Sequence, residues 1–184
     1  MGPDRIVLRG ERLVLRPVEA ADIAPLAAIL REPEIAEWWG DYPEERARAE
    51  LEGEPGWAIE VDGAVTGWLS FSEEADPDYR HVGFDIFLGT AAHGRGLGRE
   101  ALALAVRHFA GTGHHRFTID PAVANERAIR SYAAVGFRPV GVMRAYERGR
   151  DGTWHDGLLM DLLARDLEDG PAAAPSDRPP PPRR

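Results

Sequence analysis

Residues 81–110 read HVGFDIFLGTAAHGRGLGREALALAVRHFA and contain, in direct succession, the patterns of a strand, a glycine-rich turn and a helix. Apolar side chains alternate over 80–89, which predicts a strand, and recur at helical spacing over 98–110. A further strand is predicted over 116–120. Two strands joined by a helix are typical of parallel neighbours in one sheet. The stretch therefore predicts a βαβ unit.

The segments on either side add antiparallel strands. Before the unit, strands are expected over 11–18, 57–63 and 64–71, with Asp62-Gly63 as a two-residue hairpin turn. Helices are expected over 20–30, about 43–52 and 125–137, the last closed by Gly136 in a left-handed conformation. FRPVGVMRAYER and DGLLMDLL read as two final strands. This order predicts a mixed α/β sheet with one parallel pair.

The composition excludes several kinds of chemistry. The chain has 184 residues and a net charge of −9, and all 22 basic residues are arginine. Without lysine, a P-loop NTPase site and a Schiff-base mechanism are excluded. Without cysteine, disulfides, thiolate metal sites and cysteine nucleophiles are excluded. We expect one folded domain over 1–169, no bound metal, and a flexible proline-rich tail over 170–184.

The charge and the hydropathy also bear on partners. No apolar run approaches the ~18 residues of a membrane span, and the first residues lack the apolar core of a signal peptide. We expect a cytoplasmic protein, either a monomer or a homodimer. An acidic protein is a poor partner for nucleic acid or an anionic membrane, whereas it suits cationic ligands.

The glycine-rich turn, His93-Gly94-Arg95-Gly96-Leu97-Gly98-Arg99, resembles a phosphate site. Glycines let the backbone approach a ligand, and the N-terminus of a helix offers free N–H groups to phosphate. A dinucleotide fingerprint is excluded because Arg99 stands where its third glycine belongs. The spacing fits the pyrophosphate of coenzyme A, and the alternative is a tight turn with no ligand.

Four polar or aromatic residues, in or after the two strands of the βαβ unit, are candidates for the site. Asp85 lies within a strand, where aspartate is depleted, and Asp120 ends the next one. If these strands are parallel neighbours, both carboxylates face one crevice and form a cation site; the alternative for Asp85 is a solvated outer face. Asn125 suits a helix N-cap. Tyr132 is either a core tyrosine or a proton donor to a leaving group.

An acidic segment lies earlier in the chain. Residues 32–54 hold nine acidic side chains against two arginines, beside Trp38 and Trp39. Exposed indoles can stack on sugars or hold cations, and the alternative is that they fill the core. Independently of any family, this pattern supports a small polycationic substrate.

These residues together resemble the GCN5-related N-acetyltransferase (GNAT) superfamily. The similarity rests on the RGLG turn at 95–98, TID at 118–120, NERAIRSY at 125–132 and Gly136-Phe137. With EWWG at 37–40, the chain is most similar to aminoglycoside 6'-N-acetyltransferases. The resemblance implies a mostly antiparallel sheet of six to seven strands with a central parallel pair, flanked by about four helices. It also implies that acetyl-CoA is the co-substrate and that an amine of an aminoglycoside accepts the acetyl group, which would confer antibiotic resistance.

The resemblance assigns roles to individual positions. Asp85 would be the general base or an ammonium anchor, Tyr132 would protonate the leaving thiolate, and backbone N–H groups just after Asp85 would polarise the thioester. Trp38, Trp39, Asp85 and Asp120 would bind the acceptor. Coenzyme A would lie against the following residues: Ile86, Phe87, Leu88, His93, Gly94, Arg95, Gly96, Leu97, Gly98, Arg99 and Asn125. The chain departs from the family at His93, where Gln or Arg is usual.

Two alternatives remain at this stage. The segment ERLVLRP at 11–17 also resembles ribosomal-protein N-acetyltransferases, so the acceptor could be a protein N-terminus, a polyamine or a different aminosugar such as that of kasugamycin. The chain could also be a binding module for acyl-CoA or drug without turnover. Asp85 and Tyr132 argue against the binding module, because it needs neither a base nor a proton donor.

Overall fold

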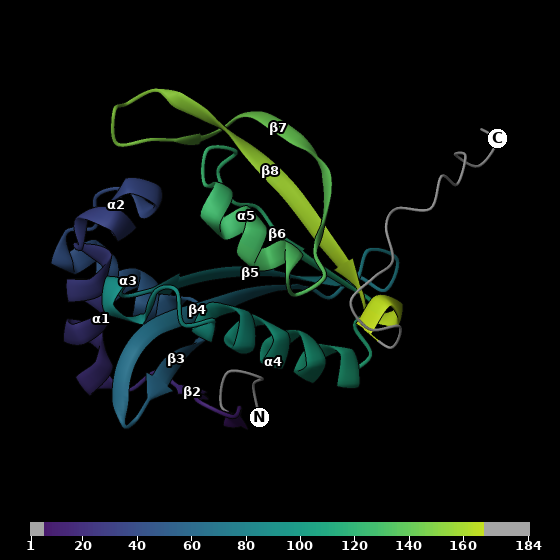
Figure 1. Ribbon diagram of the computed structural model, residues 1–184, viewed down its shortest axis with the longest axis horizontal. Coiled ribbons are helices and arrows are strands. Elements are labelled where there is room, and N and C mark those ends of the chain that lie inside the picture. Colours follow the sequence, from purple (N-terminus) through teal and green to yellow (C-terminus); the bar gives the residue numbers. More distant parts are fainter. Residues whose placement is uncertain (1–5, 168–184) are drawn as a thin grey trace.

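The computed structural model describes residues 6–167. One eight-stranded sheet runs through this part in the order β1-β2-β3-β4-β5-β6-β8-β7 (Figure 1). The strands are β1 (Leu8–Arg9), β2 (Val14–Pro17), β3 (Gly56–Val61), β4 (Ala64–Glu74), β5 (His81–Leu88), β6 (Arg116–Ile119), β7 (Arg138–Arg148) and β8 (Trp154–Leu163). The helices are α1 (Ile23–Leu30), α2 (Pro33–Trp39), α3 (Glu44–Gly53), α4 (Leu97–Gly111) and α5 (Glu126–Ala133), with 3₁₀ turns at Ala20–Asp22, Thr90–Ala92 and Ala164–Leu167.

The predicted mixed sheet with one parallel pair is confirmed. β5 and β6 are parallel and α4 connects them, whereas the other neighbouring strands of the sheet are antiparallel. The hairpin turn is also confirmed, since Asp62 and Gly63 both have positive φ, 52° and 78°, between β3 and β4. This pair of left-handed residues matches the twist of the strands it joins.

Two elements go beyond the expected numbers of strands and helices. The two-residue strand β1 pairs with β2 at the edge of the sheet and is too short to show an alternating pattern. The seven-residue helix α2 begins at Pro33, in a stretch where acidic residues interrupt the apolar pattern of a helix. Ile35 and Ala36 provide that face and are buried. The expected tail over 170–184 lies outside the described residues.

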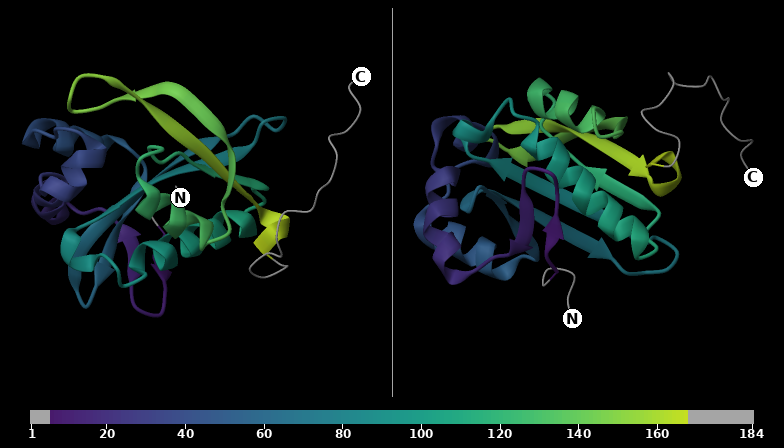
Figure 2. Two further views of the ribbon diagram at one scale, coloured as in Figure 1. Left: turned by 45° about the horizontal axis from the view of Figure 1, so that its top comes forward. Right: turned by 60° about the horizontal axis from the view of Figure 1, so that its bottom comes forward.

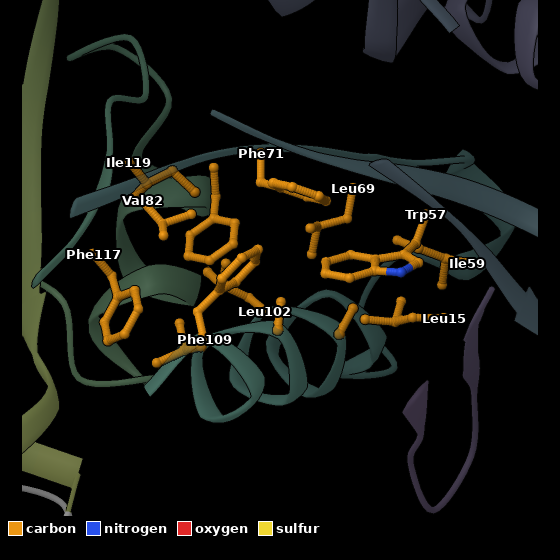
Figure 3. Close-up of a cluster of buried hydrophobic side chains, with 14 of the residues drawn as sticks. Leu15, Trp57, Ile59, Leu69, Phe71, Val82, Leu102, Phe109, Phe117 and Ile119 are labelled. Carbon is orange, nitrogen blue, oxygen red and sulfur yellow. The ribbon is translucent and has the colours of Figure 1, made fainter. Parts of the chain in front are cut away.

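Helices cover both faces of the sheet. On one face α4 packs along the strands, so that Leu69, Phe71 and Phe109 meet in a buried cluster (Figure 3). On the other face α1, α2 and α3 gather at one end of the sheet (Figures 1 and 2), where Trp68 and Phe87 are buried. Burial of each large apolar side chain contributes about 1.5–3 kcal/mol, so the two clusters hold both helical layers in position.

The sheet divides between its two parallel strands. β5 pairs with β4 along its whole length, from His81 to Leu88. It pairs with β6 only at Val82 and Gly83, opposite Phe117 and Thr118. Beyond Gly83 the two strands separate, so one edge of β5 is left without a strand partner among residues 6–167. A ligand can therefore reach the backbone of β5 at this point.

Candidate active site

A cavity of about 870 Å³ opens where β5 and β6 separate. Its walls come from β5, the turn before α4, the end of β6, α5, and the helices α2 and α3. All but one of the residues expected to form the site lie on these walls: Trp38, Trp39, Asp85, Ile86, Phe87, Leu88, His93, Gly94, Gly96, Leu97, Gly98, Arg99, Asp120, Asn125 and Tyr132. The exception is Arg95, which is exposed and does not line the cavity.

The glycine-rich turn brings backbone to the edge of the cavity. Gly94 and Gly96 have φ of 70° and 75°, a left-handed conformation that other residues adopt at a cost. Gly96 is the N-cap of α4, so the N–H groups of the first helical turn have no partner within the helix, and Leu97, Gly98 and Arg99, which carry them, line the cavity. A Cβ on Gly98 would lie 3.3 Å from Leu88 Cδ1. The turn thus fits an anionic group close to the backbone, with Arg99 beside it.

His93 holds this turn against β5 and α5. Its Nε2 lies 2.8 Å from the carbonyl oxygen of Leu88, and its Nδ1 lies 3.0 Å from Arg127 Nη1. A carbonyl only accepts and a guanidinium only donates, so Nε2 carries the proton and Nδ1 accepts. Arg127 also lies 3.6 Å from Glu34 of α2. Both ring nitrogens are therefore engaged within the protein, which favours a structural role for His93.

Asp85 is exposed to the solvent of the cavity, although protein surrounds it on most sides. Burial and the nearby carboxylates of Asp120, Glu50 and Glu54, in that order, raise the pKa of Asp85 to about 6. Both effects disfavour the charged form. A carboxylate with a pKa near neutrality is suited to exchanging protons under physiological conditions.

Asp120 follows the last residue of β6 and lines the same cavity, as its place at the carboxyl end of the strand predicted. Burial raises the pKa of Asp120, and the influence of the Tyr146 hydroxyl opposes this shift. The crevice expected between two parallel strands therefore holds both carboxylates. No cationic side chain is among the groups that shift the pKa of Asp85 or of Asp120 in either direction, so the pair is available to a positively charged ligand.

Helix α5 presents Tyr132 to the cavity. Asn125 caps the helix, its Oδ1 accepting from the Ala128 N–H at 3.1 Å, as the sequence indicated. Tyr132 packs partly against the core, and burial together with the charges of Asp85 and Asp120 raises its pKa. The phenol stays protonated at neutral pH and can donate a hydrogen bond into the cavity. The two interpretations of Tyr132, core residue and donor, are therefore compatible.

The two tryptophans line the cavity, and Trp39 also packs against the core. Trp39 packs on Phe87 and Trp68, with ring centroids 5.1 Å and 6.5 Å apart, and still lines the cavity. Trp38 lies at its rim and is half-buried. Glu34 and Glu37 join Trp38 around a smaller adjoining cavity of about 370 Å³.

Acidic and basic side chains occupy different parts of the cavity wall. The acidic segment 32–54 contributes only Glu50 and Glu54, because other members form ion pairs elsewhere, such as Glu52 with Arg48. Glu147 of β7 adds a carboxylate. Three arginines also line the cavity: Arg99 from the glycine-rich turn, Arg127, which contacts His93 of that turn, and Arg130 of α5.

The sequence interpretation missed Arg127, Tyr146 and Glu147. Arg127 stands in the NERAIRSY motif, but its contact with His93 depends on how α5 packs beside the turn. Tyr146 and Glu147 are adjacent residues of one strand, and ordinary alternation would direct only one of them toward a site. No sequence signal identifies the irregularity in β7 next to Glu147, the one of the two that lines the cavity.

Two further observations concern the part of the chain that the structure describes. Within residues 6–167, no group of three or more His, Asp or Glu side chains is arranged to hold a metal ion. None of the helices formed by these residues has the length and apolar character needed to cross a bilayer.

Comparison with known proteins agrees with this geometry. The family model for the acetyltransferase (GNAT) domain matches residues 12–138. The aminoglycoside N(6')-acetyltransferases type 1 of Klebsiella pneumoniae and Serratia marcescens are each 32% identical over 162 residues, covering 72% of this chain and 77% of theirs. The structure of Mycobacterium smegmatis RimJ in complex with CoA-disulfide superimposes with a TM-score of 0.78 and 25% identity, over 91% of this chain and 92% of that one.

A spermidine N-acetyltransferase from Vibrio cholerae, solved with CoA and spermine, shares the fold with a TM-score of 0.71 and 19% identity, over 84% of this chain and 96% of that one. GNAT enzymes use acetyl-CoA, and the glycine-rich turn at the cavity fits such a co-substrate. Because the family model spans most of the described residues and the curated relatives are 32% identical over 72% of the chain, the chain belongs to the GNAT family and is an N-acetyltransferase.

Proposed function

We propose that the chain transfers an acetyl group from acetyl-CoA to a primary amine of an aminoglycoside, with the 6'-amino group as acceptor, and thereby confers resistance. The observation that carries this proposal is the separation of charge along one cavity. Arginines and helix N–H groups lie near the glycine-rich turn, and carboxylates lie where β5 and β6 separate. The 32% identity to aminoglycoside N(6')-acetyltransferases supports the choice of acceptor.

Acetyl-CoA would bind at the basic end of the cavity. The pyrophosphate would lie over residues 94–99, where the N-terminus of α4 offers backbone donors. The pantetheine would run beside 86–88, along the edge of β5 that has no strand partner there. Asn125 and Arg99 line the same path. His93 contributes indirectly, by fixing the turn to Leu88.

The acceptor would bind at the acidic end. Asp85 and Asp120 would hold ammonium groups, with Glu50 and Glu54 extending the negative potential toward α3. Trp38 and Trp39 offer aromatic surface on which sugar rings can pack. A ligand with several ammonium groups gains from each carboxylate, whereas a monoamine gains from one only.

The reaction follows from these positions. Asp85, with a pKa of about 6, takes a proton from the bound ammonium, directly or through one water. The free amine nitrogen attacks the thioester carbonyl carbon, whose oxygen accepts hydrogen bonds from backbone N–H groups just after Asp85. The C–S bond then breaks, the sulfur takes its proton from Tyr132, and the nitrogen of the new amide loses its second proton to solvent. Solvent exchange returns the proton held by Asp85 to the phenolate, and the products are the amide and free CoA.

A second acceptor class is supported by the solved structures. RimJ shares 25% identity over nine-tenths of this chain, which is more coverage than the aminoglycoside enzymes have. A protein N-terminus is also a primary amine and would use the same base and proton donor. The acidic wall favours the aminoglycoside, because a peptide N-terminus brings a single positive charge.

A panel of acceptors tests the proposal. CoA release is measured with kanamycin, tobramycin, spermidine and an alanine-terminated peptide, and kcat/KM is compared. The aminoglycosides should give the highest values. A peptide or spermidine preferred by about tenfold, equivalent to about 1.4 kcal/mol, would overturn the acceptor while leaving the acetyl-CoA site intact. Acetyl-CoA binding without CoA release from any amine would support the non-catalytic binding module.

A further inference from the structure

The N-terminal strand β1 lies against α4, so the turn between β1 and β2 is close to the start of that helix (Figure 2). Arg12 stands in this turn, within the segment ERLVLRP at 11–17, to which the proposed reaction assigns no role. A hydrogen bond of 2.9 Å from the Gly10 N–H to the Leu13 carbonyl oxygen closes the turn. The backbone that carries Arg12 is therefore held in a defined conformation.

Glu100 holds Arg12 through both of its carboxylate oxygens. It belongs to the first turn of α4, where Oε1 accepts the backbone N–H of Arg12 at 2.8 Å and Oε2 accepts Nε of the guanidinium at 2.8 Å. A Cβ on Gly10 would lie 2.5 Å from Glu100 Oε1, so glycine leaves room for the carboxylate. Burial would raise the pKa of Glu100, but the hydrogen bonds and the charge of Arg12 help to hold it below its usual value. The carboxylate thus stays charged and fixes the guanidinium.

The other nitrogens of the Arg12 guanidinium reach the glycine-rich turn. Nη1 donates to the carbonyl oxygen of Arg95 at 2.6 Å, and Nη2 would lie 3.4 Å from a Cβ on Gly96. Neither Arg12 nor Arg95 lines the cavity, whereas Gly94 and Gly96 do. Arg12 therefore holds the turn from outside the cavity.

Binding of this carbonyl also fixes the direction of an N–H group. The peptide between Arg95 and Gly96 is trans and planar, so the Gly96 N–H points away from the carbonyl oxygen that Arg12 binds. In the part of the chain that the structure describes, this N–H donates no hydrogen bond. A guanidinium on the carbonyl also polarises the peptide and makes its N–H a stronger donor. The Gly96 N–H is thus oriented and free to bind an anion.

We propose that Arg12 is a positioning residue for acetyl-CoA: its guanidinium, held by Glu100, orients the peptide between Arg95 and Gly96 so that the Gly96 N–H meets the pyrophosphate. The inference rests on the proposed placement of the pyrophosphate over 94–99. The three hydrogen bonds of Arg12 and the fit of Gly10 to the Glu100 carboxylate carry it. Because Arg12 acts through the turn alone, its loss should weaken only those acetyl donors that have a pyrophosphate.

The variant Arg12→Gln tests this by comparing two acetyl donors. KM for acetyl-CoA, and its dissociation constant by calorimetry, should rise about tenfold, the effect of losing one hydrogen bond from a charged group. S-acetylpantetheine has the thioester but no phosphate, and its kcat/KM should stay at the wild-type value. Both assays use the amine that the acceptor panel favours. An equal loss with both donors would show that Arg12 only stabilises the fold and would overturn the proposal.

Arg48→Gln is the matched control for this variant. The side chains of Arg48 and Arg12 are both 52% exposed, and each forms an ion pair with a glutamate, but Arg48 pairs with Glu52 on α3. Arg48→Gln should change neither the acetyl-CoA affinity nor the rate with S-acetylpantetheine. A tenfold loss of acetyl-CoA affinity in this control would overturn the proposal, because it would assign the effect to net charge.

A second variant disturbs the contact without removing a charge. Gly10→Ala would place a Cβ against Glu100 Oε1, so the carboxylate must move away from Arg12, while the backbone at Gly10 has no positive φ that alanine would resist. Acetyl-CoA affinity should fall about threefold, the effect of weakening an exposed ion pair. Gly111→Ala, at the other end of α4 with open space around it, is the control. Unchanged affinity in Gly10→Ala, beside a loss in Arg12→Gln, would make Arg12 a mere surface charge and overturn the positioning role.

Dephospho-CoA separates the pyrophosphate from the 3′-phosphate, which it lacks. Arg12→Gln should weaken dephospho-CoA and CoA by the same factor in calorimetry. A loss confined to CoA would mean that Arg12 meets the 3′-phosphate directly, which would overturn the inference.

These binding measurements use no acceptor, so they do not depend on which amine is acetylated. Wild-type affinity for acetyl-CoA in Gly96→Asp would overturn the proposed placement of the pyrophosphate, and this inference with it. Lost affinity in Gly96→Asp together with wild-type affinity in Arg12→Gln would overturn this inference alone.

Discussion

Asp85 and Asp120 each lie two residues beyond Gly83 and Thr118, the last pair of the parallel ladder between β5 and β6. The two carboxylates are therefore neighbours at the point where the strands part, and both line the cavity. The charge of Asp120 contributes to the raised pKa of Asp85. A bound ammonium would relieve this repulsion, so acceptor binding and the ionisation of Asp85 are coupled.

Activity should depend on the ionisation of Asp85. Since its pKa is about 6, kcat/KM in the wild type should rise with pH through that value. Asp85→Asn should lower kcat on the order of 10²-fold and remove this limb. Asp78→Asn, an exposed position outside the cavity, is the control. A limb near pH 6 that persists in Asp85→Asn would assign it to another group.

The same carboxylate should cost stability at neutral pH. Its pKa is about 6 in the folded protein and about 3.9 in the unfolded chain, so between these values the folded state binds more protons. Wild-type stability therefore falls as pH rises from about 4 to about 6 through this group. Asp85→Asn should melt at the same temperature as wild type at pH 4 and a few degrees higher at pH 7.5, measured by calorimetry. A variant that melts lower at pH 7.5 would contradict this.

Tyr132→Phe should separate proton donation from packing. The phenyl ring keeps the contact with the core, so the fold and both KM values should change little. Loss of the hydroxyl should lower kcat on the order of 10²-fold, as for other general acids. Tyr79→Phe, 73% exposed, serves as the control. An unchanged kcat, with no viscosity dependence that would indicate limiting product release, would leave Tyr132 a packing residue.

Much of the fold could be predicted because its signals are local. Asp62 and Gly63 adopt the left-handed turn that their residue types favour, and the helix at α4 shows its buried face in the sequence. Helix α2 could not be predicted in this way. It has seven residues, and its position depends on Ile35 and Trp39 packing against side chains remote in the sequence.

In the site, too, residues with a local sequence signal could be predicted and residues placed by the packing of distant segments could not. Asp85 and Asp120 were predicted because the carboxyl ends of parallel strands meet. The place of Glu147 on the cavity wall was not, because it follows an irregularity in the pairing of β7 with β8 between Met143 and Glu147. This irregularity depends on strand register, which no single stretch of sequence encodes.

Acetyl-CoA binding should depend on Gly96. Gly96→Asp would place a Cβ 3.2 Å from Arg99 Nη2 and bring a carboxylate to the proposed phosphate position. Calorimetry should show acetyl-CoA affinity reduced by about tenfold or more. Gly152→Asp is a matched control, since Gly152 has φ of 78° and lies near Arg148, away from the cavity. Equal affinity in a folded Gly96→Asp protein would remove residues 94–99 from the binding site.

Acceptor binding should weaken with salt, and one carboxylate of α3's C-terminus should account for part of the effect. Glu54 lines the cavity, whereas Glu52 pairs with Arg48 on the outside of α3. Glu54→Gln should raise KM for tobramycin about threefold at low salt, the effect of losing one exposed charge pair, and Glu52→Gln should not.

Between about 0.01 M and about 0.15 M salt the screening length falls from about 30 Å to about 8 Å, so the difference between Glu54→Gln and wild type should shrink across that range. An acceptor with one amine should show neither the salt effect nor the difference between the variants, because it gains little from a second carboxylate. KM for acetyl-CoA, measured in the same series, should be the same in Glu54→Gln as in wild type, since its phosphates bind at the basic end of the cavity. Identical tobramycin KM values for wild type, Glu54→Gln and Glu52→Gln at low salt would show that the acidic wall at α3 does not select the acceptor.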